Sequence, residues 1–86
     1  MKVSIVTITS SDSGNVEVTT KPFSTFEKAA KYLHNEYLDI KAANGDEEYC
    51  NDEVNNLTED SIEYFYLETK DLEYWVSGNI YTMEVE

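Results

Sequence analysis

The chain has 86 residues, of which 41% are hydrophobic and 13% aromatic, and its formal net charge is −12. This length predicts a single domain over residues 1–86, with a small core that depends on aromatic side chains. The absence of arginine, together with the negative charge, argues against direct binding to nucleic acid, because cationic side chains make the contacts to phosphate.

The negative charge is confined to one half of the chain. Residues 1–45 carry five acids and five lysines and are therefore neutral, whereas residues 46–86 carry thirteen acids and one lysine, Lys70. Self-repulsion on this scale destabilises a compact state, and a field of one sign selects partners of the opposite sign. The asymmetry therefore indicates a strongly positive partner.

Two strands are predicted at the start of the chain. Residues 2–9 alternate and are rich in β-branched side chains, and residues 10–15 have the composition of a turn. Residues 16–21 form a second strand, which we expect to pair with the first as a hairpin. Pro22 is expected to end this strand, because proline cannot donate a hydrogen bond to a sheet ladder.

A helix is predicted over residues 25–43. The sequence from Ser24 to Glu27 fits a capping box, in which the Ser24 hydroxyl accepts from an amide and Glu27 reaches back. Asn44-Gly45 is a suitable end for the helix. The apolar stripe of this helix consists of Phe26, Ala29, Ala30, Leu33, Tyr37 and Ile40.

Residues 46–60 support two interpretations. Tyr49, Val54 and Leu57 would form the thin apolar side of a short helix. The many acids at the start of the segment and its paired asparagines equally indicate a loop. A loop of this length in a small domain is unusual and often functional.

Three further strands are expected in the remainder of the chain. The alternating segments are residues 61–68, 71–77 and 80–85. Gly78-Asn79 predicts a tight hairpin turn between the last two. In the first of the three, Ile62 is expected to share a face with Tyr64 and Tyr66. The order ββαβββ predicts an α+β fold, an antiparallel sheet of about five strands with one main helix packed on one face.

The acids of the second half are the candidate partner-binding residues. They either form a solvated face that keeps the protein soluble, or reproduce the charge of a nucleic-acid backbone. Duplex DNA carries one negative charge per about 1.7 Å of axis. Alternate residues of a strand lie about 6.6 Å apart and neighbouring strands about 4.8 Å, so carboxylates on a sheet can approach that density. The candidates are eleven acids and one tyrosine, namely Asp46, Glu47, Glu48, Tyr49, Asp52, Glu53, Glu59, Asp60, Glu63, Glu68, Asp71 and Glu73.

Aromatic residues of the same half favour an alternative. They are Tyr49, Tyr64, Tyr66, Tyr74, Trp75 and Tyr81. Tyrosine and tryptophan are typical anchors of protein interfaces, although on half-buried strands they also fill the core, where we expect about half of them. The protein would then be a small adaptor that binds its partner through a tyrosine-rich sheet face, with the acids serving solubility.

No motif indicates an enzyme, a metal site or another cofactor. The acidic run after Gly45 lacks the alternating ligands and central glycine of a calcium loop, and Cys50 with His34 is too small a set for zinc. The sequence contains no nucleophile elbow and no glycine-rich phosphate loop. We therefore expect a protein without catalytic activity and without cofactors.

The cellular setting follows from the cysteine content and hydropathy. Cys50 is the only cysteine, which excludes an internal disulfide and fits a reducing compartment. The segment after Lys2 alternates and does not form the continuous apolar run of a signal peptide, and no stretch approaches the roughly 20 apolar residues of a membrane span. A cytoplasmic location is expected, with no membrane partner.

The chain resembles the small acidic inhibitors made by phages and mobile elements. It shares with them its size, its acidity, its lack of arginine and its carboxylates clustered between tyrosines. DNA-mimic anti-CRISPR and anti-restriction proteins are examples. The resemblance is one of overall character, rests mainly on residues 46–86, and implies no particular fold. It implies a target in a bacterial cytoplasm, such as a CRISPR effector nuclease or another DNA-handling enzyme. It implies the role of phosphate surrogate for Asp46, Glu47, Glu48, Asp52, Glu53, Glu59, Asp60 and Glu63. The neutral first half departs from the pattern, since the most extreme DNA mimics are acidic throughout.

Overall fold

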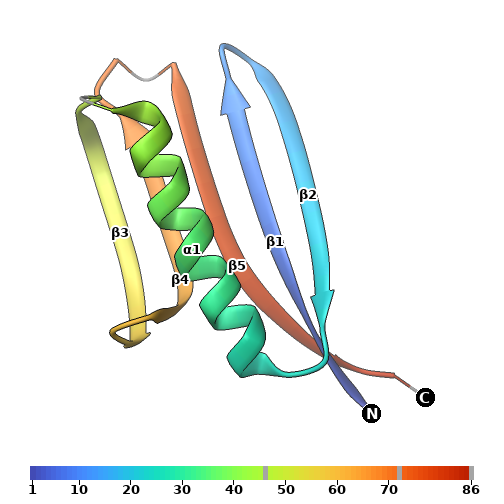
Figure 1. Cartoon of the computed structure of the whole chain (residues 1–86). Coiled ribbons are helices and arrows are strands. Elements are labelled where there is room, and N and C mark those ends of the chain that lie inside the picture. Colours follow the sequence, from blue (N-terminus) through green and yellow to red (C-terminus); the bar gives the residue numbers. More distant parts are fainter. Residues whose placement is uncertain (46, 72, 86) are drawn as a thin grey trace.

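The computed structural model describes residues 1–45, 47–71 and 73–85 as an antiparallel five-stranded sheet crossed by one helix (Figure 1). The elements are β1 (Lys2–Asp12), β2 (Asn15–Phe23), α1 (Phe26–Asn44), β3 (Tyr49–Thr58), β4 (Ser61–Thr69) and β5 (Tyr74–Glu84). The strands lie in the order β2-β1-β5-β4-β3. The predicted α+β class and the order ββαβββ are confirmed.

The predicted hairpin of β1 and β2 is present, and both strands are longer than expected. Ser13 and Gly14 form the turn with φ angles of 52° and 92°. Pro22 does not end β2 but pairs with Ile5 inside the strand. This correction follows from the position of β2 at the edge of the sheet, where one side of its backbone has no ladder partner and proline is tolerated.

The helix begins one residue later than the capping box predicted. Thr25, not Ser24, is the N-cap, and its hydroxyl accepts a hydrogen bond from the Lys28 amide at 3.2 Å. Glu27 is therefore too early to close a capping box, and its carboxylate pairs with Lys31 at 3.3 Å. The helix ends before Gly45, as predicted, and the φ of 59° at Gly45 suits a glycine.

The core lies between α1 and the middle of the sheet, where Figure 1 shows the helix crossing β4 and β5. Its buried side chains are Val6, Ala29, Leu33, Ile62, Phe65, Leu67 and Val76. Tyr37 and Ile40 of the predicted helix stripe pack against this cluster from its margin, whereas Phe26 at the start of the stripe is exposed. Burial of these apolar groups is the main term that holds the helix to the sheet.

The last strand is continuous through the predicted Gly78-Asn79 turn. Gly78 pairs with Ile8 on one side and Phe65 on the other, so residues 74–84 form one strand where two were expected. A Cβ at Gly78 would lie 2.7 Å from Leu33 Cδ1 and would also overlap the Phe65 ring. The absence of a side chain at Gly78 therefore allows α1 to pack closely against the sheet.

The fifth strand of the sheet is β3, which lies within the segment 46–60. The sequence pattern predicted either a short helix or a loop for this segment. β3 is an edge strand, and all its side chains except Tyr49 and Val54 are exposed. Acids and asparagines on such an edge are solvated and discourage pairing with another chain, which explains why the segment lacks a strand-like sequence pattern.

A bulge in β4 changes which of its residues face the core. Asn55 pairs with Tyr64 and Asn56 with Ile62, so Glu63 is an extra residue in the ladder. Ile62 and Phe65 are consequently both fully buried, although they are an odd number of residues apart. The prediction that Ile62 shares a face with Tyr64 was wrong for this reason.

The two faces of the sheet differ in cover. α1 packs on one, and no element of the described chain covers the other, which we name the open face. Register and alternation place one group of side chains from β1, β2 and β5 on the open face. We name this part of the open face the neutral face. It comprises Val3, Ile5, Thr7, Thr9, Ser11, Val16, Val18, Thr20, Pro22, Trp75, Ser77, Asn79, Tyr81 and Met83. The rest of the open face, on β3 and β4, includes Asn51, Glu53, Asn55, Tyr64, Tyr66 and Glu68.

Candidate functional site

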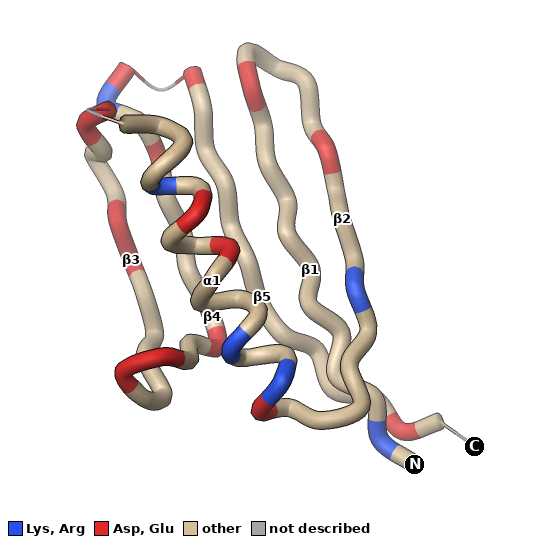
Figure 2. Tube along the Cα trace, viewed as in Figure 1, with Lys and Arg blue, Asp and Glu red and all other residues tan. Residues whose placement is uncertain are grey.

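The candidate acids lie around β3, in three groups (Figure 2). Glu47, Glu48, Asp71 and Glu73 lie in the loops at the end where β3 begins. Asp52, Glu53, Glu63 and Glu68 lie on β3 and β4 themselves. Glu59 and Asp60 form the turn between those two strands. We name these ten residues the acidic edge. Asp46 lies outside the described residues.

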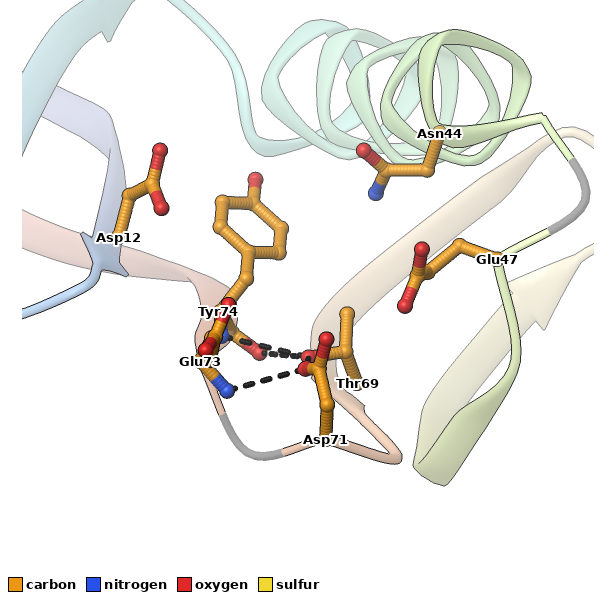
Figure 3. Close-up of a pocket in the computed structure, with 7 residues that line it drawn as sticks. All are labelled: Asp12, Asn44, Glu47, Thr69, Asp71, Glu73 and Tyr74. Carbon is orange, nitrogen blue, oxygen red and sulfur yellow. Dashed lines mark hydrogen bonds between the residues drawn. The ribbon is translucent and has the colours of Figure 1, made fainter.

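A cavity of about 300 Å³ opens at the loop end of the acidic edge. Its lining consists of Asp12, Asn44, Glu47, Thr69, Asp71, Glu73 and Tyr74. Figure 3 shows these side chains converging from the end of β1, the end of α1, the loop before β3 and the connection between β4 and β5. Asp12 was not predicted here, because it belongs to the neutral half of the chain and joins the cavity only through pairing of β1 with β5.

Asp71 is held in place beside this cavity as a fixed anion. The Thr69 hydroxyl donates to its Oδ1 at 2.6 Å, and the Glu73 amide donates to the same oxygen at 3.1 Å. The bond from Thr69, followed by the one from the Glu73 amide, lowers the pKa of Asp71 below its ordinary value. The carboxylate is therefore charged at neutral pH.

Two acids of the edge are turned toward lysines of the same chain. Lys41 Nζ lies 2.6 Å from Asp52 Oδ2, and Lys70 Nζ lies 3.2 Å from Glu48 Oε2. Burial raises the pKa of Asp52, but the hydrogen bonds from Lys41 and Tyr37 outweigh it, so the pKa lies below the ordinary value. The role of Asp52 in this structure is to join β3 to α1, and its charge is offset within the chain.

Glu63 and Glu68 accept hydrogen bonds from asparagines of β3. Asn51 Nδ2 donates to Glu68 Oε1 at 2.8 Å, and Asn55 Nδ2 donates to Glu63. These bonds fix the two carboxylates without neutralising them, because the donors are uncharged. They therefore keep rigid negative charges on the flank of the sheet.

The aromatic candidates divide between the two faces. Tyr49 and Tyr74 pack against the core on the helix side, and Asn44 Nδ2 donates to the Tyr49 hydroxyl at 2.8 Å. Tyr64, Tyr66, Trp75 and Tyr81 lie on the open face. Tyr66 and Trp75 are neighbours there, with ring centroids 6.3 Å apart. Tyr49 is thus a packing residue, and the aromatic surface lies on β4 and β5.

The acidic edge is less dense in charge than DNA. β3 has ten residues and is therefore about 33 Å long at about 3.3 Å per residue. Six described acids lie among the fourteen residues from 47 to 60, which span about 46 Å at the same rise, so there is about one acid per 8 Å, against one per 3.4 Å along a single DNA strand. The edge therefore provides about half the linear charge of one strand, before the pairs with Lys41 and Lys70 are discounted.

The described residues contain neither a metal-binding cluster nor a membrane-spanning helix. Within residues 1–45, 47–71 and 73–85, no group of three or more histidine, cysteine, aspartate or glutamate side chains could hold a metal ion. In the same residues, no helix is both long and apolar enough to cross a membrane.

No family model matches the chain, and no curated protein and no solved structure gives a match.

Proposed function

We propose that the protein is a non-enzymatic inhibitor that mimics nucleic-acid charge and blocks a basic DNA- or RNA-binding site on another protein. The observation that supports this is the gathering of acids along β3 and at both of its ends (Figure 2). Four of the six lysines lie elsewhere, on β1, β2 and the first half of α1, namely Lys2, Lys21, Lys28 and Lys31. A field of one sign therefore extends from one side of the molecule.

The mechanism is electrostatic occupation of a site that phosphates would otherwise fill. Attraction between the acidic edge and a basic groove accelerates encounter and weakens as ionic strength rises. Rigid carboxylates such as Glu63, Glu68 and Asp71 lose little freedom on binding, because hydrogen bonds already hold them. The proposed target class is a CRISPR effector nuclease or another bacterial defence nuclease, which would place the protein in a bacterial cytoplasm.

The test is competition between the protein and labelled duplex DNA for a CRISPR effector nuclease. The edge variant combines Glu47→Gln, Glu53→Gln, Glu59→Gln and Asp60→Asn. We expect it to displace the duplex at least about tenfold less well than wild type at low salt, because four charges of the binding edge are lost.

A control variant separates position from net charge. It combines Glu17→Gln, Glu27→Gln, Glu36→Gln and Asp39→Asn, which changes the net charge by the same four units but leaves the acidic edge intact. Its displacement of duplex should stay within about threefold of wild type, since these four acids lie on β2 and α1 and not on the acidic edge. Equal losses in both variants, or binding that is indifferent to DNA and to salt, would overturn the proposal.

A second function is favoured by the aromatic side chains of β4 and β5. Tyr64, Tyr66 and Trp75 lie on the open face, and Tyr64 is 37% exposed. An adaptor would bind a partner through these rings, with hydrophobic burial as the main driving force. Affinity for a partner captured from a bacterial lysate would then survive high salt and the edge variant, and would be lost in Tyr64→Ala with Tyr66→Ala.

A further inference from the structure

The neutral face contains no charged residue at any of its positions. This is unusual in a chain of which 28% is charged, because about four charged residues would be expected among fourteen positions. The positions facing solvent on a one-sided antiparallel sheet are normally polar or charged. Eight of its fourteen side chains are apolar or aromatic and six are polar but uncharged, so the face lacks the charged groups that normally solvate such a surface.

Large apolar side chains on this face are accessible. Val16 and Val18 are each 61% exposed, Tyr81 is 63% exposed and Met83 is 40% exposed. They form two groups at opposite ends of the face, separated by Thr7, Thr9, Thr20, Ser77 and Asn79, which are polar but uncharged. Exposed apolar groups bordered by polar residues mark interaction sites in soluble proteins. α1 packs on the opposite face, and within residues 1–45, 47–71 and 73–85 no other element covers these strands.

The absence of charge limits what can cover the face. A cationic partner, as proposed for the acidic edge, would find no carboxylate to pair with here. A second copy of the chain presents the same uncharged surface, and burial of that surface leaves no ion unpaired. We propose that the neutral face is the interface of a symmetric dimer of this protein.

A two-fold axis parallel to the strands and centred on β1 gives a consistent packing. It places β2 of one copy over β5 of the other, with residues at the same height in the sheet facing each other. Ser11 of β1 pairs with Val16 on one side and Trp75 on the other, so these two residues are at the same height, and Val16 of one copy lies over Trp75 of the other. Ile5 pairs in the same way with Pro22 and Tyr81, which places Pro22 over Tyr81. Each contact occurs twice, as an isologous interface requires.

The same axis separates the acidic edges. β3 lies three strand positions from β1, so the two β3 strands would lie on opposite sides of the dimer, about 29 Å apart at about 4.8 Å per strand. That separation exceeds the Debye length of about 8–10 Å at physiological salt. Two copies with a net charge of −12 each can therefore associate through this face, with both edges exposed.

The size of the face predicts a weak dimer. Three strands of about eleven residues cover about 500 Å² in plan, at about 3.3 Å per residue and 4.8 Å per strand. Corrugation by side chains enlarges this area toward the roughly 800 Å² per partner of a standard interface. A dissociation constant in the micromolar range is expected.

Sedimentation equilibrium over a range of protein concentrations tests the inference. We expect a monomer–dimer equilibrium that tightens by at least about threefold when salt is raised from about 20 mM to about 500 mM, because screening weakens repulsion between like-charged copies. This direction is opposite to the salt dependence expected for a basic partner. A monomer at every concentration and salt would overturn the inference, as would a dimer that dissociates at high salt.

Variants identify the face. Val16→Lys places a charge under Trp75 of the second copy and should weaken the dimer at least about tenfold, and Val18→Lys should do the same. Leu38→Lys, on the exposed side of α1 where Leu38 is 48% exposed, is the matched control and should leave the equilibrium unchanged. Circular dichroism confirms that each variant is folded. A dimer insensitive to both valine variants, or equally sensitive to Leu38→Lys, would overturn the inference.

This inference does not depend on the proposed inhibitor function, and the two can fail separately. The edge variant with four neutralised acids should still form the dimer, because none of its positions lies on the neutral face. Val16→Lys should still compete with duplex DNA, because the acidic edge is unchanged.

Discussion

Lys41 of α1 and Asp52 of β3 form an ion pair of 2.6 Å, and the Tyr37 hydroxyl donates to the other oxygen of the same carboxylate at 2.7 Å. β3 is an edge strand whose ladder joins it only to β4. The cluster of Lys41, Tyr37 and Asp52 therefore adds a polar connection between this strand and the helix, on the side of the sheet that carries most of the acids.

Asp52→Asn should destabilise the protein by about 0.5–1 kcal/mol at pH 7, the usual range for a partly exposed pair. Its pKa is depressed in the folded protein, so the contribution is complete above the ordinary aspartate pKa of about 3.9 and is lost as pH falls through the lower folded value. Urea unfolding at pH 7 and at about pH 2.5 measures both effects. Glu27→Gln, which breaks the exposed pair with Lys31, is the control and should change stability less. An equal difference between Asp52→Asn and wild type at both pH values would contradict the expectation.

Gly78→Ala should destabilise the protein by about 1–3 kcal/mol, because the added methyl group has to displace Leu33 and Phe65 in a packed core. Asn79→Ala is the matched control, since Asn79 is the next residue along β5 and is exposed on the open face. Its effect should stay within about 0.5 kcal/mol. Thermal and urea unfolding measure both variants, and native stability in Gly78→Ala would show that α1 does not press on this position.

The thiol of Cys50 should react slowly despite its exposure. Partial desolvation raises its pKa, and the bond it donates to Glu68 Oε1 at 3.4 Å raises it further. The reaction rate with a disulfide reagent, followed against pH, should have a midpoint above the ordinary cysteine value. Glu68→Gln removes the negative charge and should move the midpoint down. An unchanged midpoint in that variant would rule out the contribution of Glu68.

Added salt should stabilise the fold. Repulsion within the acidic edge destabilises the compact state and is screened as ionic strength rises. The free energy of unfolding in urea should increase between about 20 mM and about 500 mM sodium chloride. The edge variant with four neutralised acids should be more stable than wild type at low salt and respond less to added salt. A fold that loses stability as salt rises would indicate that attractive pairs, such as that of Lys41, outweigh the repulsion.

Local sequence patterns predicted much of this fold, because hydrophobic periodicity and turn chemistry act over short distances. The first hairpin, the helix and β4 followed from alternation, helical period and the glycine after Asn44. The failures involved residues whose role depends on distant neighbours. Gly78 has the sequence signature of a turn, but it serves the approach of α1 to the sheet. Pro22 has the signature of a strand end and is tolerated because β2 lies at an edge.

The candidate site was predicted in composition but not in arrangement. The sequence identified the acids and their concentration in the second half of the chain. It did not show that Asp52 and Glu48 pair with Lys41 and Lys70, because those contacts depend on how α1 and the loops meet the sheet. Nor did it bring Asp12 to the cavity, since only the pairing of β1 with β5 places it there.

The bulge at Glu63 has a consequence for changes in chain length. It lets the first residues of β4 and the rest of that strand both direct apolar groups toward α1. Deletion of Glu63 removes the extra residue and leaves Ile62 two positions before Phe65, so ordinary alternation keeps both side chains on the core face. Deletion of Glu63 should therefore be tolerated, whereas deletion of Tyr66 would place Phe65 and Leu67 on opposite faces of the sheet, so the length of this strand is constrained more strongly beyond the bulge than at it.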